Sequence, residues 1–256
     1  MAGLPPLIDT HAHICDDAFN EDRAQVLARA EAAGVAAIIA VGEDLPDAEK
    51  NLALARQYPI LRPSAGLYPT FLDPAAADEM ASFIRRHRDG LWAVGEIGLD
   101  FWAVKEEAER AVQRDIFAQF INLARELDLP LNVHSRSAGR HAVQMLAERG
   151  AVRVQLHAFD GKFSTARPAA EAGYYFSIPP SVVRSRQKQK LVYHLPLERL
   201  LVETDSPVLG ADGAVRNEPA NLPLAIGAIA EIKQVSEETV RATVGQNARD
   251  LYRLTW

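Results

Sequence analysis

The sequence predicts a closed (β/α)8 TIM barrel, a single α/β domain that spans residues 1–256. Short apolar segments rich in β-branched residues alternate with longer segments of helical periodicity along the whole chain. Eight such short segments in a chain of 256 residues suit one barrel. The alternative is an open doubly wound sheet, which would place a glycine-rich turn after its first strand, and no G-x-G-x-x-G motif follows here.

The eight short apolar segments are the predicted strands. Each is nearly continuous in apolar residues, which is typical of parallel strands that are covered on both faces. We expect strands at Leu7–Asp9, Val35–Val41, Leu61–Leu67, Leu91–Glu96, Pro130–His134, Arg153–His157, Gly173–Ile178 and Arg199–Glu203.

Helical periodicity is clearest between Glu106 and Leu127, where apolar residues recur three or four positions apart. A second apolar stripe of this kind follows Leu222, and Ser236 with the two glutamates after it predicts the N-cap of the last helix. The segment from Leu209 to Pro223 contains several glycines and prolines, so we expect it to be the longest irregular stretch.

Composition narrows the class of protein. The apolar fraction of 48% supports a sizeable core, and the net charge of -6 argues against a broad basic surface for nucleic acid. A nucleic-acid substrate would therefore be held locally. The single cysteine, Cys15, suits a reducing cytoplasm and is expected to be buried. We find no signal-peptide pattern and no apolar run long enough to cross a bilayer, so we expect a cytoplasmic protein without membrane contact.

Ligand-type side chains stand at the carboxyl ends of the predicted strands, where barrel enzymes place their functional residues. His11 and His13 end the first strand and, as alternate residues, point to the same face. The fourth, fifth, sixth and eighth strands end near Glu96, His134, His157 and Asp205. Any one of these histidines could be a polar residue that caps the barrel. Together the six residues indicate a metal site.

Six ligands are too many for one tetrahedral zinc site and suit two ions that share a carboxylate. Mixed imidazole and carboxylate donors are compatible with Zn, Mn, Co or Mg. Two such ions would clamp an oxyanion and lower the pKa of a bridging water, whose proton a nearby carboxylate could accept as general base. The other three histidines, His87, His141 and His194, are expected on helices rather than at this site.

In their sequence context these residues resemble the TatD-like metal-dependent hydrolases. These are TIM-barrel members of the amidohydrolase superfamily, and many are called TatD-type deoxyribonucleases. The segment from Ser177 to Lys190 is especially similar to the branch with eukaryotic TatD-domain-containing deoxyribonucleases. The motifs that carry the resemblance are His11-x-His13, Glu96-Ile-Gly-Leu-Asp100, His134-Ser-Arg136, His157-Ala-Phe-x-Gly161, Glu203-Thr-Asp205-Ser-Pro207, Arg216-Asn-Glu-Pro219 and Gln246-Asn-Ala248.

The resemblance implies two ligand sets and a reaction. One ion would be held by His11, His13 and Asp205, and the other by His134 and His157. Glu96 would bridge the two ions, and Asp205 would also serve as base for the attacking water. The implied reaction is hydrolysis of phosphodiester bonds, typically at DNA ends.

One position departs from the family pattern. Many members carry Gly-x-His-Pro after the third strand, whereas this chain reads Gly66-Leu-Tyr68-Pro69. In the family that histidine lies near the substrate, so Tyr68 alters phosphate contact, leaving-group protonation or substrate range. A tyrosine hydroxyl can still donate a hydrogen bond to phosphate.

Further residues are candidates for holding the substrate. Arg136 and Arg216 could each meet two phosphate oxygens, with a surface salt bridge as the alternative for both. Glu203 shares the strand parity of Asp205, so we expect it just inside the mouth, where it either contacts substrate or supports a ligand. Asp100 is expected to orient a ligand histidine. The basic cluster is expected to be a solvated helix face; it consists of Arg184, Arg186, Lys188 and Lys190.

Three functions remain open. The first is a monomeric, metal-dependent phosphodiesterase that acts on DNA ends or single strands. The second is a metal-dependent hydrolase of C–N or C–O bonds, such as a deacylase or amidase, which the negative net charge and Tyr68 favour. The third is a catalytically silent barrel that binds a protein partner through its loops. Divalent-ion-dependent degradation of DNA that Glu96→Ala abolishes would distinguish the first from the others.

Overall fold

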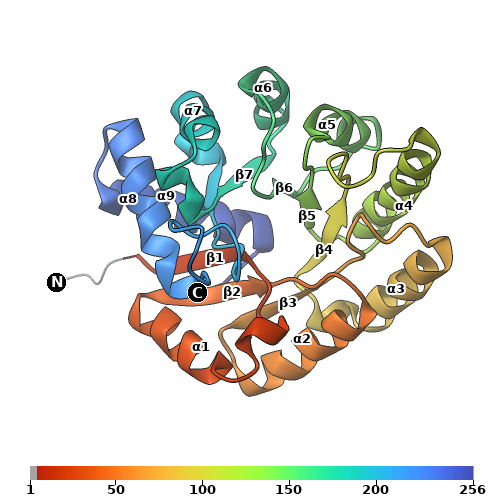
Figure 1. Ribbon diagram of the computed structural model, residues 1–256, viewed down its shortest axis with the longest axis horizontal. Helices are drawn as coiled ribbons and strands as arrows, with labels where there is room; N and C mark the ends of the chain where they lie inside the picture. Colours follow the sequence, from red (N-terminus) through yellow and green to blue (C-terminus); the bar gives the residue numbers. More distant parts are fainter. Residues whose placement is uncertain (1–4, 256) are drawn as a thin grey trace.

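The computed structural model describes residues 5–255, and these form the expected barrel (Figure 1). Eight parallel strands pair in sequence order from β1 to β8, and each coincides with a predicted strand, which confirms the fold class. The predicted domain 1–256 also includes residues 1–4 and 256, which lie outside the described part. The strands are β1 (Leu7–Ala12), β2 (Val35–Ala40), β3 (Leu61–Ala65), β4 (Ala93–Gly98), β5 (Leu131–His134), β6 (Val154–Leu156), β7 (Tyr175–Ile178) and β8 (Leu200–Val202).

The last strand returns to the first one, and this seam sets two important segments side by side. Thr10 Oγ1 donates to the carbonyl of Val202 at 3.0 Å, and just above it the Asp205 N–H donates to the His11 carbonyl at 2.8 Å. The His13 N–H donates to the Ser206 carbonyl at 2.9 Å. The segment after β8 is therefore fastened along the carboxyl end of β1.

Within residues 5–255, a ring of eight α-helices covers the outside of the barrel, and a ninth follows them (Figure 1). The main core lies between the strands and this ring. The helix predicted from Glu106 to Leu127 is confirmed as α4, and the Ser236 hydroxyl caps α9 by accepting from the Thr239 N–H. The helices are α1 (Arg23–Ala32), α2 (Leu45–Gln57), α3 (Pro74–Arg86), α4 (Glu107–Glu126), α5 (Gly139–Glu148), α6 (Phe163–Glu171), α7 (Arg186–His194), α8 (Leu222–Lys233) and α9 (Glu237–Tyr252).

The irregular segment predicted from Leu209 to Pro223 is shorter than expected. A 3-10 helix occupies Pro219–Asn221, and α8 already begins at Leu222. Pro223 lies in the first turn of α8, where a helix needs no hydrogen bond from the backbone nitrogen. Proline there marks the start of a helix and not the end of a loop.

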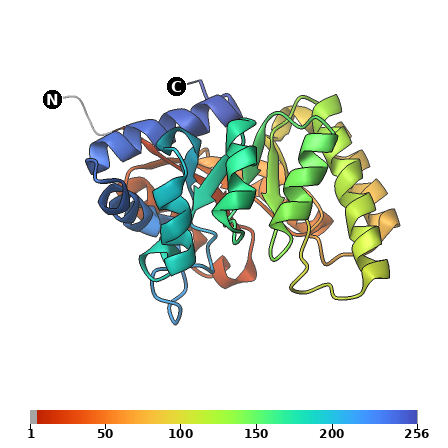
Figure 2. The same ribbon diagram turned by 90° about the horizontal axis from the view of Figure 1, so that it is seen from above.

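Helix α9 closes one end of the barrel and leaves the other end free. In Figure 2 it runs across the top, while the loops that follow the strands project from the opposite side. Its buried side chains pack on inward-facing apolar residues of the strands, including Ile8 and Leu201. The Tyr252 hydroxyl reaches into the barrel and donates to Gln155 Oε1 at 2.6 Å. Function is therefore expected at the loop-bearing end.

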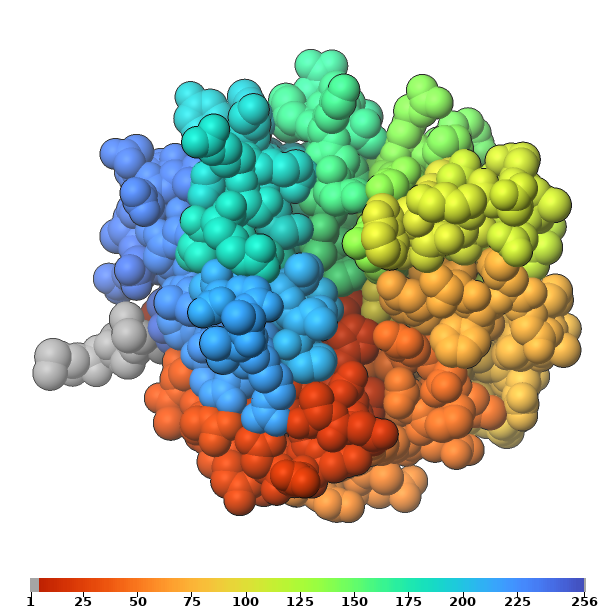
Figure 3. All heavy atoms as spheres, viewed as in Figure 1, coloured from red at the N-terminus to blue at the C-terminus, as the bar shows by residue number. Residues whose placement is uncertain are grey.

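The loop-bearing end faces the viewer in Figure 3. There the blue segment after β8 lies against the red segment after β1, as the seam requires, and the surface is hollowed between them and the green segments after β5 and β6. Among the described residues, no helix is long and apolar enough to cross a membrane.

Candidate metal centre

A cavity of about 390 Å³ opens at the loop-bearing end of the barrel. Side chains from the ends of four strands or the loops after them line it: Tyr68, His134, Arg136, His157 and Asp205. Five of the six predicted metal ligands are buried, and the side chain of His13 is 13% exposed. The strands thus deliver the predicted residues to one place, as their positions in the sequence indicated.

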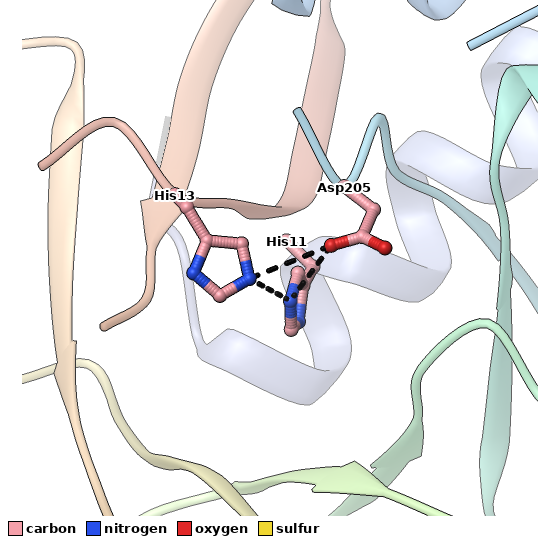
Figure 4. Close-up of side chains that lie close together, drawn as sticks. All are labelled: His11, His13 and Asp205. Atoms are coloured by element: carbon pink, nitrogen blue, oxygen red, sulfur yellow. Dashed lines mark hydrogen bonds and ion pairs between the residues drawn. The ribbon is translucent and has the colours of Figure 1, made fainter. Parts of the chain in front are cut away.

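The first group of donor atoms gathers around β1 and the segment after β8 (Figure 4). His11 Nε2 lies 3.3 Å from His13 Nε2 and 3.4 Å from Asp205 Oδ1. His13 Nε2 lies 3.5 Å from the same carboxylate oxygen. Glu96 Oε2 lies 3.5 Å from the nitrogen of His11 and 3.4 Å from that of His13. The donor atoms of His11, His13 and Asp205 are thus near enough to one another to hold one ion, and Glu96 Oε2 lies beside the two imidazoles.

The second group lies beside the first and uses the other oxygen of Glu96. Glu96 Oε1 is 2.8 Å from His134 Nδ1 and 3.2 Å from His157 Nε2. The two imidazole nitrogens are 3.4 Å apart. His11 and His157 stack with ring centroids 3.8 Å apart, which keeps the two groups adjacent. Glu96 thus presents one oxygen to each group.

Glycines let Glu96 reach this depth. A Cβ on Gly98, whose φ is +143°, would overlap the carbonyl oxygen of His134, and one on Gly95 would lie 2.6 Å from the carbonyl oxygen of Asn132. The backbones of β4 and β5 can approach this closely only because both positions lack a side chain. Asp205 has a φ of +53°, a conformation that aspartate tolerates better than most residues.

Two of the candidate ligand histidines are oriented from behind by a hydrogen bond to another side chain. His11 Nδ1 donates to Asn132 Oδ1 at 2.9 Å, which turns its Nε2 toward the first group. His134 Nε2 pairs with Asp100 Oδ2 at 3.1 Å, so its Nδ1 faces Glu96. Partners of this kind fix the tautomer of a metal-binding imidazole. The predicted role of Asp100 agrees with this geometry.

Glu203 supports His157 from below and does not line the cavity. Its Oε2 lies 3.5 Å from His157 Nδ1 and accepts from the Ser177 hydroxyl at 2.5 Å. Its Oε1 accepts from the Ala158 N–H at 2.8 Å. Of the two roles predicted for Glu203, this geometry favours support of a ligand over contact with substrate.

The clustered histidines and carboxylates shift one another's pKa values strongly. Burial alone would lower the pKa of His13, but the hydrogen bonds that Asp205 and Glu96 accept from it outweigh burial and raise the pKa to about 9. Burial would also lower the pKa of His134, but its hydrogen bonds to Asp100 and Glu96 outweigh burial and raise the pKa to about 9. Conversely, although burial would raise it, the pKa of Glu96 lies well below its usual range because of the charges of His157 and His11. The cluster therefore favours positive charge at its centre.

The donor atoms fit a divalent cation. Glu96 Oε2 is buried and has no hydrogen-bond partner among residues 5–255, although two imidazoles face it. Separations of 3.3–3.5 Å are long for an N–H···O bond. They match the edge of a tetrahedron, about 3.3–3.4 Å, around an ion with bonds of about 2.0–2.1 Å. The site can thus hold a divalent metal ion.

A scan against protein-family models decides the family. The model described as TatD related DNase matches residues 8–253. The chain belongs to this family. The predicted resemblance is confirmed.

Individual TatD-family relatives agree with the family match. Deoxyribonuclease TATDN3 of Homo sapiens is 42% identical over 259 residues, which cover 96% of this chain and 94% of the relative. The 3'-5' ssDNA/RNA exonuclease TatD of Salmonella typhimurium is 30% identical and covers 98% of this chain and 100% of its own. The crystal structure of YJJV, a TatD homolog from Escherichia coli, superposes with a TM-score of 0.90 at 26% identity and covers 97% and 98% of the two chains.

In this TatD-family chain the predicted substrate contacts divide into two sets. Arg136 and Tyr68 line the cavity, and the Arg136 guanidinium stacks 3.7 Å above the ring centroid of Trp102. Arg216 instead forms an ion pair of 2.6 Å with Asp22 and lies outside the cavity lining. For Arg216 the structure therefore shows the predicted alternative, a salt bridge between loops.

The basic cluster in and just before α7 is not uniformly solvated, which corrects one prediction. Arg184, Arg186 and Lys190 are exposed, but Lys188 is only 9% exposed and lines the cavity. On a helix, residues two positions apart point in nearly opposite directions, so the cluster cannot share one face. That alternation was the signal in the sequence that could have located Lys188.

The remaining histidines lie away from the metal centre, as predicted. His141 lies on α5, and His194 is the last residue of α7. His87 follows α3, where its ring packs 4.4 Å from that of Phe83, so it is half-buried and not fully solvated. Cys15 is buried, as expected.

Proposed function

We propose that this chain is a divalent-metal-dependent phosphodiesterase that removes nucleotides from the 3' end of single-stranded DNA. The observation that carries the proposal is the sharing of Glu96 between two groups of histidine and carboxylate donors. The names of the relatives support it, since one is called a deoxyribonuclease and another a 3'-5' ssDNA/RNA exonuclease.

In this proposal the first group, with His11, His13 and Asp205, holds one ion, and His134 with His157 holds the second. Glu96 would offer one oxygen to each ion, and the mixed imidazole and carboxylate donors would accept Zn, Mn, Co or Mg. When bound, two such ions polarise the phosphodiester and bring the pKa of water toward neutrality.

Asp205 accepts the proton of the attacking water. Its Oδ1 lies 3.4 Å from His11 Nε2 and 3.5 Å from His13 Nε2. Burial would raise the pKa of this carboxyl, but the two imidazoles hold it well below its usual range, so the group is ionised at neutral pH. The water oxygen forms the new bond to phosphorus as the bond to the 3' oxygen breaks, and the water proton passes to Asp205.

The cavity also offers groups to the phosphate. Arg136 can present two donors to phosphate oxygens, and its stacking on Trp102 limits the freedom that it loses on binding. Burial, with Glu96 nearby, raises the pKa of Tyr68, so its hydroxyl keeps its proton and can donate it to the leaving group or to a phosphate oxygen. We place the enzyme in the cytoplasm as a monomer, where its buried cysteine suits reducing conditions.

The test uses a single-stranded oligonucleotide labelled at its 5' end. The protein with Mn²⁺, Mg²⁺, Co²⁺ or Zn²⁺ should shorten it from the 3' end one nucleotide at a time, and EDTA should stop the reaction. Asp205→Asn should reduce kcat by about 10²–10⁴-fold. The control is Asp89→Asn, an exposed carboxylate before β4 at the opposite end of the barrel, which should leave kcat unchanged.

Two results would contradict the proposal. Degradation by Asp205→Asn at the wild-type rate would remove this residue from the reaction. Cleavage of aminoacyl or amide substrates by metal-loaded protein that leaves DNA intact would assign the site to carbonyl chemistry instead.

A further inference from the structure

Lys188 is a buried ammonium that the reaction described above does not use. It lies in the first turn of α7, and its side chain is directed into the cavity beside His157 and Asp205. Its Nζ makes one hydrogen bond, to the carbonyl of Ala158 at 3.2 Å. Within residues 5–255 it forms no ion pair with a carboxylate. Two of its three N–H groups therefore have no acceptor in the described chain.

An ammonium in this state is costly. Burying a charged group without a partner within contact distance is unfavourable, and most buried lysines are paired. Burial lowers the pKa of Lys188, against the attraction of Glu203, Asp205 and Asp160. These carboxylates are near enough to act on the ammonium through their charge but form no hydrogen bond or ion pair with it. A group of opposite charge that enters the cavity would supply the missing acceptors.

Ser135 is a second polar group that the same cavity leaves without a partner. It follows the ligand His134, is 2% exposed and lines the cavity. Its hydroxyl makes no hydrogen bond with any residue from 5 to 255. A buried hydroxyl without a partner costs about 1–3 kcal/mol. Two donors without a full set of acceptors, one in the loop after β5 and one on α7, thus belong to residues that line the same cavity.

The ligand that fits is an anion with several acceptor oxygens. A carboxylate or a phosphate could each accept hydrogen bonds from an ammonium and a hydroxyl. An anion held between Lys188 and Ser135 would also lie beside the candidate metal ligands, where the reaction takes place. Three metal donors, His134, His157 and Asp205, line this same cavity. A phosphate held there is the group that undergoes attack.

We propose that Lys188 and Ser135 form a phosphate subsite that holds the non-bridging oxygens of the scissile phosphodiester. Its identification with a DNA phosphate rests on the proposed function, whereas binding of a phosphate does not. Lys188 donates two N–H bonds, and Ser135 donates one O–H bond. As the phosphorus gains its fifth oxygen, negative charge on the non-bridging oxygens grows, and the fixed ammonium stabilises it.

The test measures binding of inorganic phosphate to metal-loaded protein by isothermal titration calorimetry, together with kcat and KM on the oligonucleotide. Lys188→Met keeps the length of the side chain and removes the charge, and it should weaken phosphate binding and lower kcat/KM by about 10- to 100-fold. Lys188→Arg should recover most of the loss. Ser135→Ala should cost about 2- to 10-fold. The control is Lys190→Met, an exposed lysine on the same helix, which should change neither quantity.

A merely structural role for Lys188 predicts a different pattern. If it only fixes the Ala158 carbonyl and thereby His157, Lys188→Met should lower metal affinity and Tm while loaded protein binds phosphate as before. That result would overturn the subsite, as would unchanged phosphate binding and unchanged kcat/KM in both Lys188→Met and Ser135→Ala. If the wild type leaves DNA intact but its phosphate binding depends on Lys188, the proposed function fails and the subsite stands.

Discussion

Glu203→Gln separates the two roles that the sequence allowed for this buried carboxylate. Glu203 accepts hydrogen bonds from Ser177 Oγ and the Ala158 N–H, and its Oε2 lies 3.5 Å from His157 Nδ1. Glutamine keeps the shape and an acceptor for Ala158. It removes the negative charge that holds the imidazole in the orientation and tautomer that a metal requires.

The expected size follows from these contacts. Loss of a carboxylate behind a metal-binding histidine costs about 10- to 100-fold in metal affinity, or about 1.4–2.7 kcal/mol. The side-chain amide also points a donor toward Gln155 Nε2, which lies 3.4 Å from Glu203 Oε2. We therefore expect a further loss of about 1–3 kcal/mol in the free energy of unfolding. Because Glu203 does not line the cavity, KM at saturating metal should stay close to that of the wild type.

Titration of metal-free protein with Zn²⁺ against a chromophoric chelator gives the affinities, and urea unfolding gives the stability. The matched control is Glu218→Gln, because Glu218 pairs with Arg29 at the surface. It should change metal affinity by less than twofold, because a surface ion pair affects only the stability of the fold, by about 0–1 kcal/mol. Unchanged metal affinity together with a raised KM in Glu203→Gln would refute the reasoning and return Glu203 to the substrate.

Three further predictions follow from the fold and the site. Gly98→Ala forces a side chain against His134 at a φ of +143°, so it should lower the free energy of unfolding in urea by about 3 kcal/mol or more and impair metal binding. The control is Gly150→Ala, which has no atom nearer than 4.0 Å and should lower it by about 1 kcal/mol. Equal losses in the two variants would contradict this. Burial raises the pKa of Asp9 to about 7. Between about pH 4 and 7 native Asp9 keeps a proton that the unfolded chain releases, so the free energy of unfolding of the wild type should fall as the pH rises. Asp9→Asn lacks this proton, so its stability relative to the wild type should rise by at most about 1.4 kcal/mol per pH unit. A difference independent of pH would exclude this. Arg216→Ala should leave kcat/KM unchanged and alter stability by about 1 kcal/mol or less, and a raised KM would restore its predicted phosphate contact.

The barrel and the meeting of the candidate ligands at one end of it could be predicted because the two signals reinforce each other. Parallel strands buried on both faces are continuous in apolar residues, so all eight were visible in the sequence. Once the strands were placed, their carboxyl ends had to meet at one mouth. His11-x-His13 shows the logic locally, since alternate residues on a strand share a face, and their Nε2 atoms lie 3.3 Å apart.

The residues that support the ligands could not be assigned in the same way. Asn132 precedes His134 by two positions and so also faces inward, but its partner is His11, which is 121 positions away. Such a pairing depends on the stagger between strands across the barrel, which leaves no local pattern. Lys188 is hard to assign for another reason. Charge alone groups it with Arg186 and Lys190, although helical geometry turns it to the opposite side of α7.

The central claim, two cations bridged by Glu96, is tested most directly by anomalous diffraction from crystals soaked in Mn²⁺. The account predicts two peaks about 3.5–4 Å apart, each in contact with one oxygen of Glu96. One peak should contact His11, His13 and Asp205, and the other His134 and His157, and Glu96→Gln crystals should lose the pair. A single peak, or none, in the wild type would contradict it.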